Sequence, residues 1–380
     1  MLRIGIVAGE VSGDLLGADL ITALRKQRPD LEITGIGGPR LIEAGCNTLY
    51  PMEKLALMGI AEVLGRFPEL WNIRRRLRDH FLAQRPDVFI GVDAPDFNFP
   101  LERALRSAGI KTIHYVSPSI WAWREYRLRA IARAVDLMLT VFPFENAWYE
   151  KYRIPVCFVG HPLARRIPLA TDKTGARRKL GLPEGKTIIA IMPGSRKSEL
   201  EKHVRIFLEA ANWCSRNMDN LHFASSLTNA RARSFFEYNA GMTSPQIPMS
   251  MYTDRSLEVM EAADVVLLAS GTAALEAMLL KRPMVVGHKV SWLTWQIARR
   301  LVRLPYVSLP NVLAGRNIVP ECLQHECTPE NLGREILHWL QHPDEVRQLA
   351  DEFTGLHRSI RADSDAILAN AVLHAIHAAA

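Results

Sequence analysis

Residues 4–14 read IGIVAGEVSGD, and this stretch shows the unit from which the fold is built. The apolar run IGIVA at residues 4–8 is followed by a turn with two glycines and then by a longer amphipathic segment. A run that is apolar on both faces is typical of a buried parallel strand, because helices cover both sides of such a sheet. The stretch therefore predicts a strand, a turn and a helix in that order.

The same pattern recurs along the first half of the chain. Further apolar runs lie at residues 88–92 (VFIGV), 112–116 (TIHYV) and 137–142 (LMLTVF), with amphipathic stretches between them. Right-handed crossovers through helices join such strands into an open, doubly wound sheet. We predict one Rossmann-like domain over residues 1–163.

A polar, basic stretch at residues 165–179 separates this half from a second one. New apolar runs then occupy residues 187–192, 265–269 and 284–286. The prediction is an α/β protein of GT-B architecture, with two Rossmann-like domains facing one another across a cleft. The second domain covers residues 164–345, and residues 346–380 are expected to be helices that pack back on the first domain or exchange with a partner chain.

Composition limits the classes of partner. Of the 380 residues, 48% are hydrophobic and 23% are charged, which fits a compact two-domain protein. The net charge of +7 favours an anionic partner, such as nucleic acid, a phosphorylated metabolite or an acidic membrane surface. The basic residues accompany apolar helices and no nucleic-acid module is recognisable, so we do not expect nucleic acid.

The cysteines and the hydropathy pattern predict a cytoplasmic protein. The five cysteines have no framework spacing, and the chain starts directly with a strand rather than a signal peptide. His325 lies between Cys322 and Cys327, but without a second pair of ligands these are better interpreted as surface helix residues than as a metal site. No apolar run approaches the roughly 18 residues of a spanning helix, so membrane contact is expected to be peripheral.

The first candidate phosphate loop is GEVSGD at residues 9–14. Its glycines let the backbone approach a ligand at a helix N-terminus, but the spacing is not that of the dinucleotide fingerprint. A tight turn capped by Ser12 or Asp14 is an equally good interpretation. Glu10 lies just after the strand, where it can bind a sugar hydroxyl or cap a neighbour.

The second candidate loop follows the strand at residues 187–192. Gly194 and Ser195 offer backbone N–H groups and a hydroxyl at a helix N-terminus, and Arg196 offers a planar fork that suits a diphosphate. The alternative is a turn whose arginine is merely solvated.

The third candidate loop follows the strand at residues 265–269. Ser270, Gly271 and Thr272 can cap a helix and bind phosphate, and Glu276 lies one helical turn further on, where it can accept both ribose hydroxyls. The alternative for Glu276 is an ordinary acid that complements the helix dipole.

Taken together, the motifs resemble those of the lipid-A-disaccharide synthase family over nearly the whole chain. They are GEVSGD (9–14), GVDAPDFN (91–98), HYVSPSIWAW (114–123), PGSR (193–196) with Glu199, ASGTAALE (269–276) and SLPNVLAGR (308–316), with VGHP (159–162) between the halves. One departure is the pair His288 and Lys289 after VVG, where relatives carry an aromatic residue followed by a basic one.

The resemblance implies an inverting glycosyltransferase that joins UDP-diacylglucosamine to diacylglucosamine 1-phosphate through a β-1,6 linkage. It implies that the reaction takes place on the cytoplasmic face of the inner membrane, with UDP in the second domain and a homodimer as the assembly. Carried over motif by motif, Asp93 falls on the general base, Arg196 on a diphosphate contact, Glu276 on a ribose contact and Asn311 on a residue essential to turnover. Glu10 and Ser195 lie in motifs that line the same cleft.

The residue types suit such a reaction. An inverting transfer needs one carboxylate to take the proton of the attacking hydroxyl, and Asp93 ends a strand of the first domain. Asp96 is a rival for this role and is otherwise a neighbour or helix cap. The D-x-D spacing of Asp363 and Asp365 lies in the helical tail, far from the phosphate loops, so we expect neither a metal nor a cofactor.

A surface for a bilayer is predicted between residues 57 and 78. Its apolar residues include Ile60, Val63, Leu64, Phe67, Leu70 and Trp71, and arginines at 74, 75, 76 and 78 follow them. An apolar face with a basic flank suits an anionic leaflet, although apolar stripes at helical spacing are more often core. A similar stretch begins at Trp292.

Two other functions compete with this interpretation. One is a different UDP-sugar enzyme of the same architecture, such as a nucleotide-sugar epimerase, which would act without an acceptor. The other is a nucleotide-binding or sugar-binding module without catalysis, for which Asp93 and Asn311 would be incidental.

Overall fold

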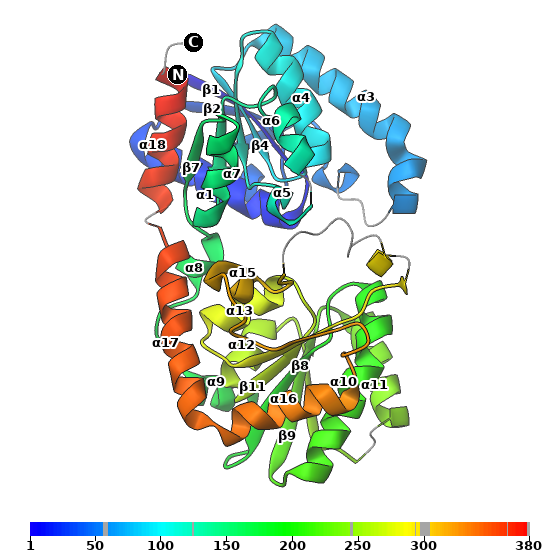
Figure 1. Cartoon of the computed structure of the whole chain (residues 1–380). Helices are drawn as coiled ribbons and strands as arrows, with labels where there is room; N and C mark the ends of the chain where they lie inside the picture. Colours follow the sequence, from blue (N-terminus) through cyan, green and yellow to red (C-terminus); the bar gives the residue numbers. More distant parts are fainter. Residues whose placement is uncertain are drawn as a thin grey trace. The chain divides into compact units, whose positions relative to one another are not determined.

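The chain forms two compact units (Figure 1). A computed structural model describes residues 1–55, 60–123, 125–243, 246–292, 294–296, 305–362 and 364–377, apart from the side chains of residues 60–67, 122–123 and 364. Unit 1 comprises Met1–Pro162 with Ile360–Ala380, and unit 2 comprises Leu163–Ser359. Each unit is built on a parallel sheet, so the predicted α/β class with two domains is confirmed.

The sheet of unit 1 has seven parallel strands in the order β3-β2-β1-β4-β5-β6-β7. The strands are β1 (Leu2–Ala8), β2 (Leu31–Ile36), β3 (Cys46–Thr48), β4 (Val88–Val92), β5 (Lys111–Tyr115), β6 (Leu137–Thr140) and β7 (Val156–Phe158). The four predicted apolar runs form β1, β4, β5 and β6, which lie side by side. Burial on both faces explains why these strands carry few polar residues.

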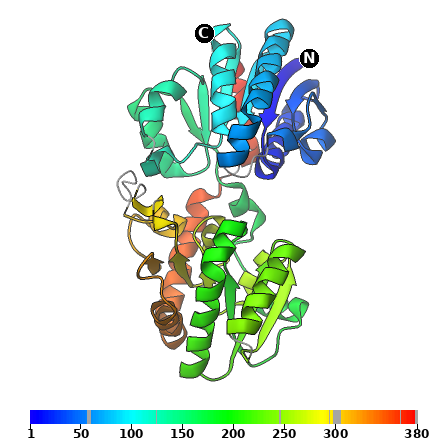
Figure 2. The ribbon, with the colours of Figure 1, turned by 90° about the vertical axis from the view of Figure 1, so that its right-hand side faces the viewer.

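Helices cover both sides of this sheet. They are α1 (Val11–Gln27), α2 (Pro39–Glu43), α3 (Ile60–Gln84), α4 (Pro95–Ser107), α5 (Ile120–Trp123), α6 (Leu128–Ile131), α7 (Asn146–Lys151) and α18 (Ser364–His377), with the 3-10 helices η1 (Met52–Lys54), η2 (Glu125–Arg127) and η3 (Pro143–Glu145). In Figures 1 and 2, α3 and α4 flank one side of the sheet and α18 the other, where it packs on α1. Leu77 and Phe81 of α3 meet Leu101 and Leu105 of α4 in a buried cluster with Phe89 of β4, which fixes both helices on the sheet.

The sheet of unit 2 has six parallel strands in the order β10-β9-β8-β11-β12-β13. The strands are β8 (Thr187–Met192), β9 (Leu221–Leu227), β10 (Met249–Thr253), β11 (Val265–Leu268), β12 (Met284–His288) and β13 (Glu321–Leu323). The helices are α8 (Pro162–Arg166), α9 (Lys173–Leu180), α10 (Lys197–Asn217), α11 (Ala230–Thr243), α12 (Ser256–Ala262), α13 (Thr272–Leu279), α15 (Leu309–Ala314), α16 (Pro329–Gln341) and α17 (Pro343–Ile360). Helix α10 packs with α11 and α16, and α12 packs with α9 and α13.

The end of the chain is helical, as predicted, and it contributes to both units. Helix α17 belongs to unit 2 up to Ser359, where its His357 lies 2.7 Å from Lys281 Nζ and 2.7 Å from the carbonyl oxygen of Ala164. Helix α18 belongs to unit 1, where Asp365 accepts a 2.9 Å hydrogen bond from Lys26 of α1.

Candidate active site

In unit 1 the candidate residues lie at the carboxyl edge of the sheet, where loops follow neighbouring strands. Glu10 follows β1 and Asp93 follows β4, and these two strands are hydrogen-bonded to one another. A Cβ added to Gly9 would lie 2.8 Å from Cβ of Ala94, so the two loops are pressed together and only glycine fits at that position. The structure thus brings the loop of Glu10 beside the turn of Asp93.

The Asp93 turn is held in an uncommon backbone conformation. Asp93 and Ala94 both have left-handed backbones, with φ of 51° and 45°, and each such non-glycine residue costs on the order of 1–3 kcal/mol. The N–H of Asp93 donates to the carbonyl oxygen of Tyr115 at 2.9 Å, and Pro95 then starts α4. The surrounding structure must therefore impose this turn.

Asn98 acts as the clamp of this turn. Its side chain is fully buried, and its amide donates to the carbonyl oxygen of Asp93 at 2.8 Å and to that of Val7 at 3.3 Å. One side chain thus ties the ends of β1 and β4 together. Sequence reasoning did not single out Asn98, although it closes the GVDAPDFN motif.

Asp93 and Asp96 differ in their surroundings. The Asp93 carboxylate is half-buried and has no hydrogen bond or ion pair with any described residue. The Asp96 side chain is 77% exposed and pairs with Arg127 at 2.7 Å. Of the two, Asp93 is free to take a proton from a ligand.

In the GEVSGD loop, neither Ser12 nor Asp14 caps the helix that follows. Glu10 is exposed and precedes α1 without a capping side-chain hydrogen bond. The buried Asp14 carboxylate instead accepts from the N–H groups of Gly38, Arg40 and Leu41, at 2.7, 3.0 and 3.0 Å, and so caps α2. The alternative that Ser12 or Asp14 caps α1 was wrong, since α1 has no side-chain cap and Asp14 caps the next helix.

In unit 2 the loop after β8 already contains an anion. The Glu199 carboxylate accepts from the N–H groups of Ser195 and Arg196, at 2.9 and 3.2 Å. Gly194 has φ of 115°, and a Cβ there would lie 2.6 Å from the Glu199 side chain, so glycine is required. A diphosphate would compete with Glu199 for these two donors, whereas the exposed Arg196 guanidinium makes no ion pair with a described residue.

The loop after β11 lies beside that after β8, because these strands are neighbours. Gly271 precedes Thr272 at the start of α13; it has φ of 121°, and a Cβ there would have no described atom within 4 Å. Ser270 is half-buried and Thr272 is exposed. Burial raises the pKa of Glu276 on α13 to about 7, so near neutral pH this carboxyl group can both donate to and accept from hydroxyl groups.

Asn311 is fully buried and is anchored by hydrogen bonds from both ends of its side-chain amide. Its amide nitrogen donates to Asn317 Oδ1 at 2.8 Å, to Val319 O at 2.9 Å and to Glu321 Oε1 at 2.8 Å. Its oxygen accepts from the N–H groups of Ile318 and Val319 at 2.8 and 3.0 Å. The side chain has no exposed surface, and these hydrogen bonds position the SLPNVLAGR loop against β13.

Similarity to known proteins now decides the family. The sequence pattern of the family described as lipid-A-disaccharide synthetase matches residues 4–372. The lipid-A-disaccharide synthase of Vibrio cholerae serotype O1 is 49% identical over 375 residues, which cover 99% of this chain and 98% of that protein. The chain belongs to the lipid-A-disaccharide synthetase family.

Solved structures of other proteins share the fold of this synthetase-family member. UDP-GlcNAc 2-epimerase from Neisseria meningitidis, bound to UDP-GlcNAc, superposes with a TM-score of 0.63 at 12% identity, over 98% of this chain and 99% of that one. The glycotransferase of kitacinnamycin gives a TM-score of 0.63 at 19% identity, over 98% of each chain. These likenesses establish the two-domain architecture.

Unit 1 also contains a buried pair of ionisable side chains that sequence reasoning missed. Glu102 of α4 and His114 of β5 are fully buried, with Oε1 and Nδ1 2.7 Å apart. A Cβ on Gly91 would lie 2.0 Å from this Glu102 oxygen, which explains the glycine in GVDAPDFN. Burial raises the pKa of Glu102, an effect that His114 partly offsets. Neither residue type nor spacing predicts this pair, because Glu102 and His114 lie on different elements that come into contact only when the chain folds.

A second buried carboxyl lies under the loop of the HYVSPSIWAW motif. Glu145 of η3 accepts from the N–H groups of Val141 and Phe142, at 3.2 and 3.1 Å. Burial raises its pKa to about 7. Nearby, the Ser117 hydroxyl lies 2.7 Å from that of Tyr149. These contacts tie the loop after β5 to the loop after β6.

The buried His203 of α10 lies against the end of β12. Its Nε2 accepts from the N–H of Lys289 at 3.0 Å, and its ring centroid is 5.4 Å from that of His288. Burial lowers the pKa of His203 to about 4 and lowers that of His288 as well. Both rings are therefore neutral at pH 7, and the unusual His288 packs against His203.

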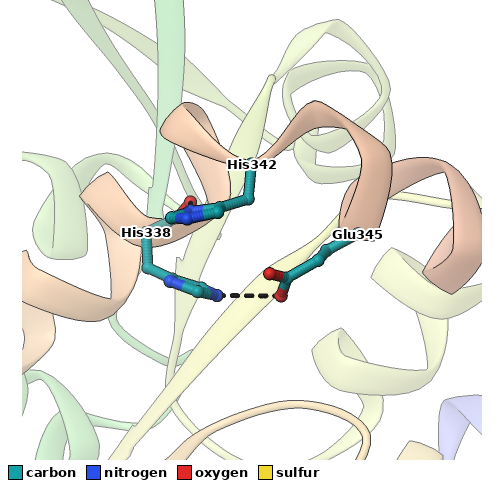
Figure 3. Close-up of side chains that lie close together, drawn as sticks. All are labelled: His338, His342 and Glu345. Atoms are coloured by element: carbon teal, nitrogen blue, oxygen red, sulfur yellow. Dashed lines mark hydrogen bonds and ion pairs between the residues drawn. The ribbon is translucent and has the colours of Figure 1, made fainter.

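Three side chains of types that can bind a metal, His338, His342 and Glu345, lie close together at the junction of α16 and α17 (Figure 3). His338 Nε2 is 2.9 Å from Glu345 Oε2, and His342 Nδ1 is 2.8 Å from the carbonyl oxygen of His338. His342 and Glu345 are exposed, so these contacts suffice to explain the cluster.

The predicted D-x-D residue Asp363 lies outside the described residues, and Asp365 pairs with Lys26. Cys322 and Cys327 are free and buried, not on the surface as expected.

The predicted membrane patch is only partly described. The side chains of Ile60, Val63, Leu64 and Phe67 lie outside the described residues. Leu70 packs against the core of unit 1, whereas Trp71 is 49% exposed. Among the described residues, no helix is both long and apolar enough to cross a bilayer.

Proposed function

We propose that this member of the lipid-A-disaccharide synthetase family is an inverting glycosyltransferase of lipid A biosynthesis, which condenses UDP-2,3-diacylglucosamine with 2,3-diacylglucosamine 1-phosphate. The uncommitted Asp93 carboxylate, held by the clamped turn after β4, is the observation that carries the mechanism. Asp96 suits the role less well because Arg127 already occupies it.

In the proposed reaction the 6-hydroxyl oxygen of the acceptor attacks the anomeric carbon of the donor. Its proton passes to the Asp93 carboxylate as the new carbon–oxygen bond forms. The bond between the anomeric carbon and UDP breaks on the opposite face, and its electron pair stays on the diphosphate oxygen. Inversion at this carbon gives the β-1,6 linkage.

Unit 2 is proposed to bind UDP at its carboxyl edge. The exposed Arg196 supplies a planar fork to the diphosphate, and the hydroxyls of Ser270 and Thr272 supply further donors. Glu276 lies one turn into α13, and its partly protonated carboxyl suits a diol such as ribose. The backbone N–H groups of Ser195 and Arg196 join this set only after Glu199 releases them.

Both substrates carry acyl chains, so we propose peripheral association with the cytoplasmic face of the inner membrane. The exposed Trp71 on α3 supports a contact with the interface. A homodimer is part of the same proposal, and α18, which packs on α1, is the element whose exchange would form it.

Release of UDP tests the proposal. The protein is incubated in mixed micelles with both substrates and a chelator, and UDP and the disaccharide 1-phosphate are quantified. We expect release only when the acceptor is present, because the hydroxyl is a reactant. Conversion of the donor without acceptor would instead indicate an epimerase, and UDP binding without turnover would indicate a binding module.

A further inference from the structure

A small basic cavity lies between α3 and α4 of unit 1, two helices that run beside one another in Figure 1. Its volume is about 110 Å³ and it is lined by Trp71, Arg74, Arg75, Arg78, Pro100, Leu101 and Ala104. A single water needs only about 10–15 Å³ on such a measure. The cavity therefore has room for a group of several heavy atoms.

Helical spacing along α3 explains how the arginines converge. Leu77 and Phe81 point into the core, which fixes the orientation of the helix. Residues 71, 74, 75 and 78 are spaced i, i+3, i+4 and i+7, so they form one stripe next to that buried face. The stripe faces Pro100 and Ala104 of α4 across the cavity.

Two of the three cavity arginines have no countercharge among the residues that the structure describes. Arg78 donates to Asp79 at 2.9 and 2.7 Å. By contrast, neither Arg74 nor Arg75 forms an ion pair with any described residue. The carboxylate of Asp96, whose backbone oxygen Arg74 reaches, pairs with Arg127 instead.

The contacts that Arg74 and Arg75 do make are weak and neutral. Arg74 reaches the backbone oxygen of Asp96 at 3.5 Å, and Arg75 reaches Asn72 Oδ1 at 3.4 Å, both at the long limit for a hydrogen bond. Burial lowers the pKa of Arg74, as expected for a cation withdrawn from water without a partner. The Arg75 guanidinium lies 5.2 Å from the centroid of the Trp71 ring, which holds it in place.

From this arrangement we propose that the cavity between α3 and α4 binds a phosphate group carried by a membrane lipid. Planar guanidinium forks match phosphate oxygens, and two of them here are positioned but unpaired. Trp71 at the rim has the amphipathic character of residues that lie at a bilayer interface.

Two sources of such a group are considered: the acceptor, through its 1-phosphate, and an anionic phospholipid, through its headgroup. The acceptor alternative rests on the proposed function, whereas the headgroup alternative does not. The two sources are distinguished by experiment.

The test compares two double variants with the same loss of charge. Arg74→Ala with Arg75→Ala removes the unpaired forks, and Arg76→Ala with Arg103→Ala removes exposed arginines of the same two helices outside the cavity. Thermal unfolding establishes that each variant is folded. Should the alanine pair fold poorly, Arg74→Lys with Arg75→Lys keeps the charge and removes only the fork geometry.

The first measurement is the KM for the acceptor in neutral detergent micelles that contain no phospholipid. If the 1-phosphate occupies the cavity, the cavity variant raises this KM about tenfold or more, because charge-assisted hydrogen bonds are lost, and the control variant does not. The KM for the UDP-sugar stays unchanged in both.

The second measurement is co-sedimentation with vesicles of phosphatidylcholine, with and without phosphatidylglycerol. If a phospholipid headgroup occupies the cavity, binding to the anionic vesicles falls about tenfold in the cavity variant but not in the control. This measurement needs no turnover, so it stands even if the wild type releases no UDP. Equal behaviour of the two variants in both measurements overturns the proposal.

Discussion

Asp93 illustrates how single residues shape the site of unit 1. Its left-handed backbone is unfavourable by itself, yet the hydrogen bonds to Tyr115 and Asn98 fix it at the end of β4. Gly9 clears the space that Ala94 occupies. The position of the carboxylate thus depends on neighbours that do not react.

Replacement of Asn98 by alanine should therefore affect both stability and catalysis. Two buried carbonyl groups lose their donor, which costs about 1–3 kcal/mol in the free energy of unfolding. The relaxed turn displaces Asp93, and kcat should fall about 10- to 100-fold. Urea denaturation and steady-state kinetics measure the two effects, with Asn239→Ala on the surface of α11 as the control. Full kcat in a destabilised Asn98→Ala variant would contradict the clamp.

Asn311 makes a different prediction, because its side chain serves the fold of unit 2. Alanine at this position leaves the backbone N–H groups of Ile318 and Val319 without this acceptor and removes one of the donors to the Glu321 carboxylate, so thermal unfolding should shift down by roughly 5–10 °C. Thr272→Ala, at an exposed position, should weaken UDP binding with no such shift. An Asn311→Ala variant with an unchanged unfolding temperature would instead place that side chain in direct contact with substrate.

At the scale of elements, continuous runs of apolar residues predicted the central strands of both sheets but not all of the other strands. The predicted runs became β1, β4, β5, β6, β8, β11 and β12. Strand β9 was missed because it is interrupted by polar residues that find partners only in the fold, such as Ser225, whose hydroxyl donates to Ile191 O at 2.7 Å. Strands β3, β7 and β13 have three residues each, too few for a pattern.

The loops show the same limit. Sequence could place Asp93 and Arg196 in loops that follow strands, and Glu276 one turn into the next helix, because residue type and spacing suffice for that. It could not show that Glu199 occupies the loop amides or that Asn311 is buried, since both depend on contacts between elements.

The short element η3 makes stability depend on pH. The Glu145 carboxyl has an ordinary pKa of 4.5 when unfolded and about 7 when folded. Between these values the folded protein holds the additional proton, so the free energy of unfolding falls as the pH rises and levels off above about 7. The loss is of order 3 kcal/mol.

Glu145→Gln removes this titration, so its free energy of unfolding should fall less between pH 5 and pH 8 than that of the wild type. Denaturant unfolding of unit 1 is carried out at pH 5 and at pH 8, with hydrogen exchange as the readout, to measure the difference. Glu150→Gln, an exposed neighbour on α7, should behave as the wild type. Parallel curves for all three proteins would rule out a shifted Glu145.

At the scale of the whole molecule, the proposed UDP site in unit 2 predicts that UDP stabilises unit 2 and not unit 1. UDP at about 100 times its dissociation constant should stabilise the unit that binds it by about 2.7 kcal/mol. Hydrogen exchange should show slower exchange in unit 2, around residues 194–199 and 270–276, with little change around residues 93–98 of unit 1. Slower exchange confined to unit 1 would reverse the assignment of the donor site.

Asp93 as general base is the central claim, and the matched pair Asp93→Asn and Asp96→Asn tests it most directly. Acceptor-dependent UDP release is measured for both variants at saturating donor, with UDP affinity as the check on the donor site. We expect kcat of Asp93→Asn to fall about 10²- to 10⁴-fold, with unchanged UDP affinity, while Asp96→Asn stays within a few-fold of the wild type. Full activity of Asp93→Asn, or a collapse of Asp96→Asn alone, would contradict the account.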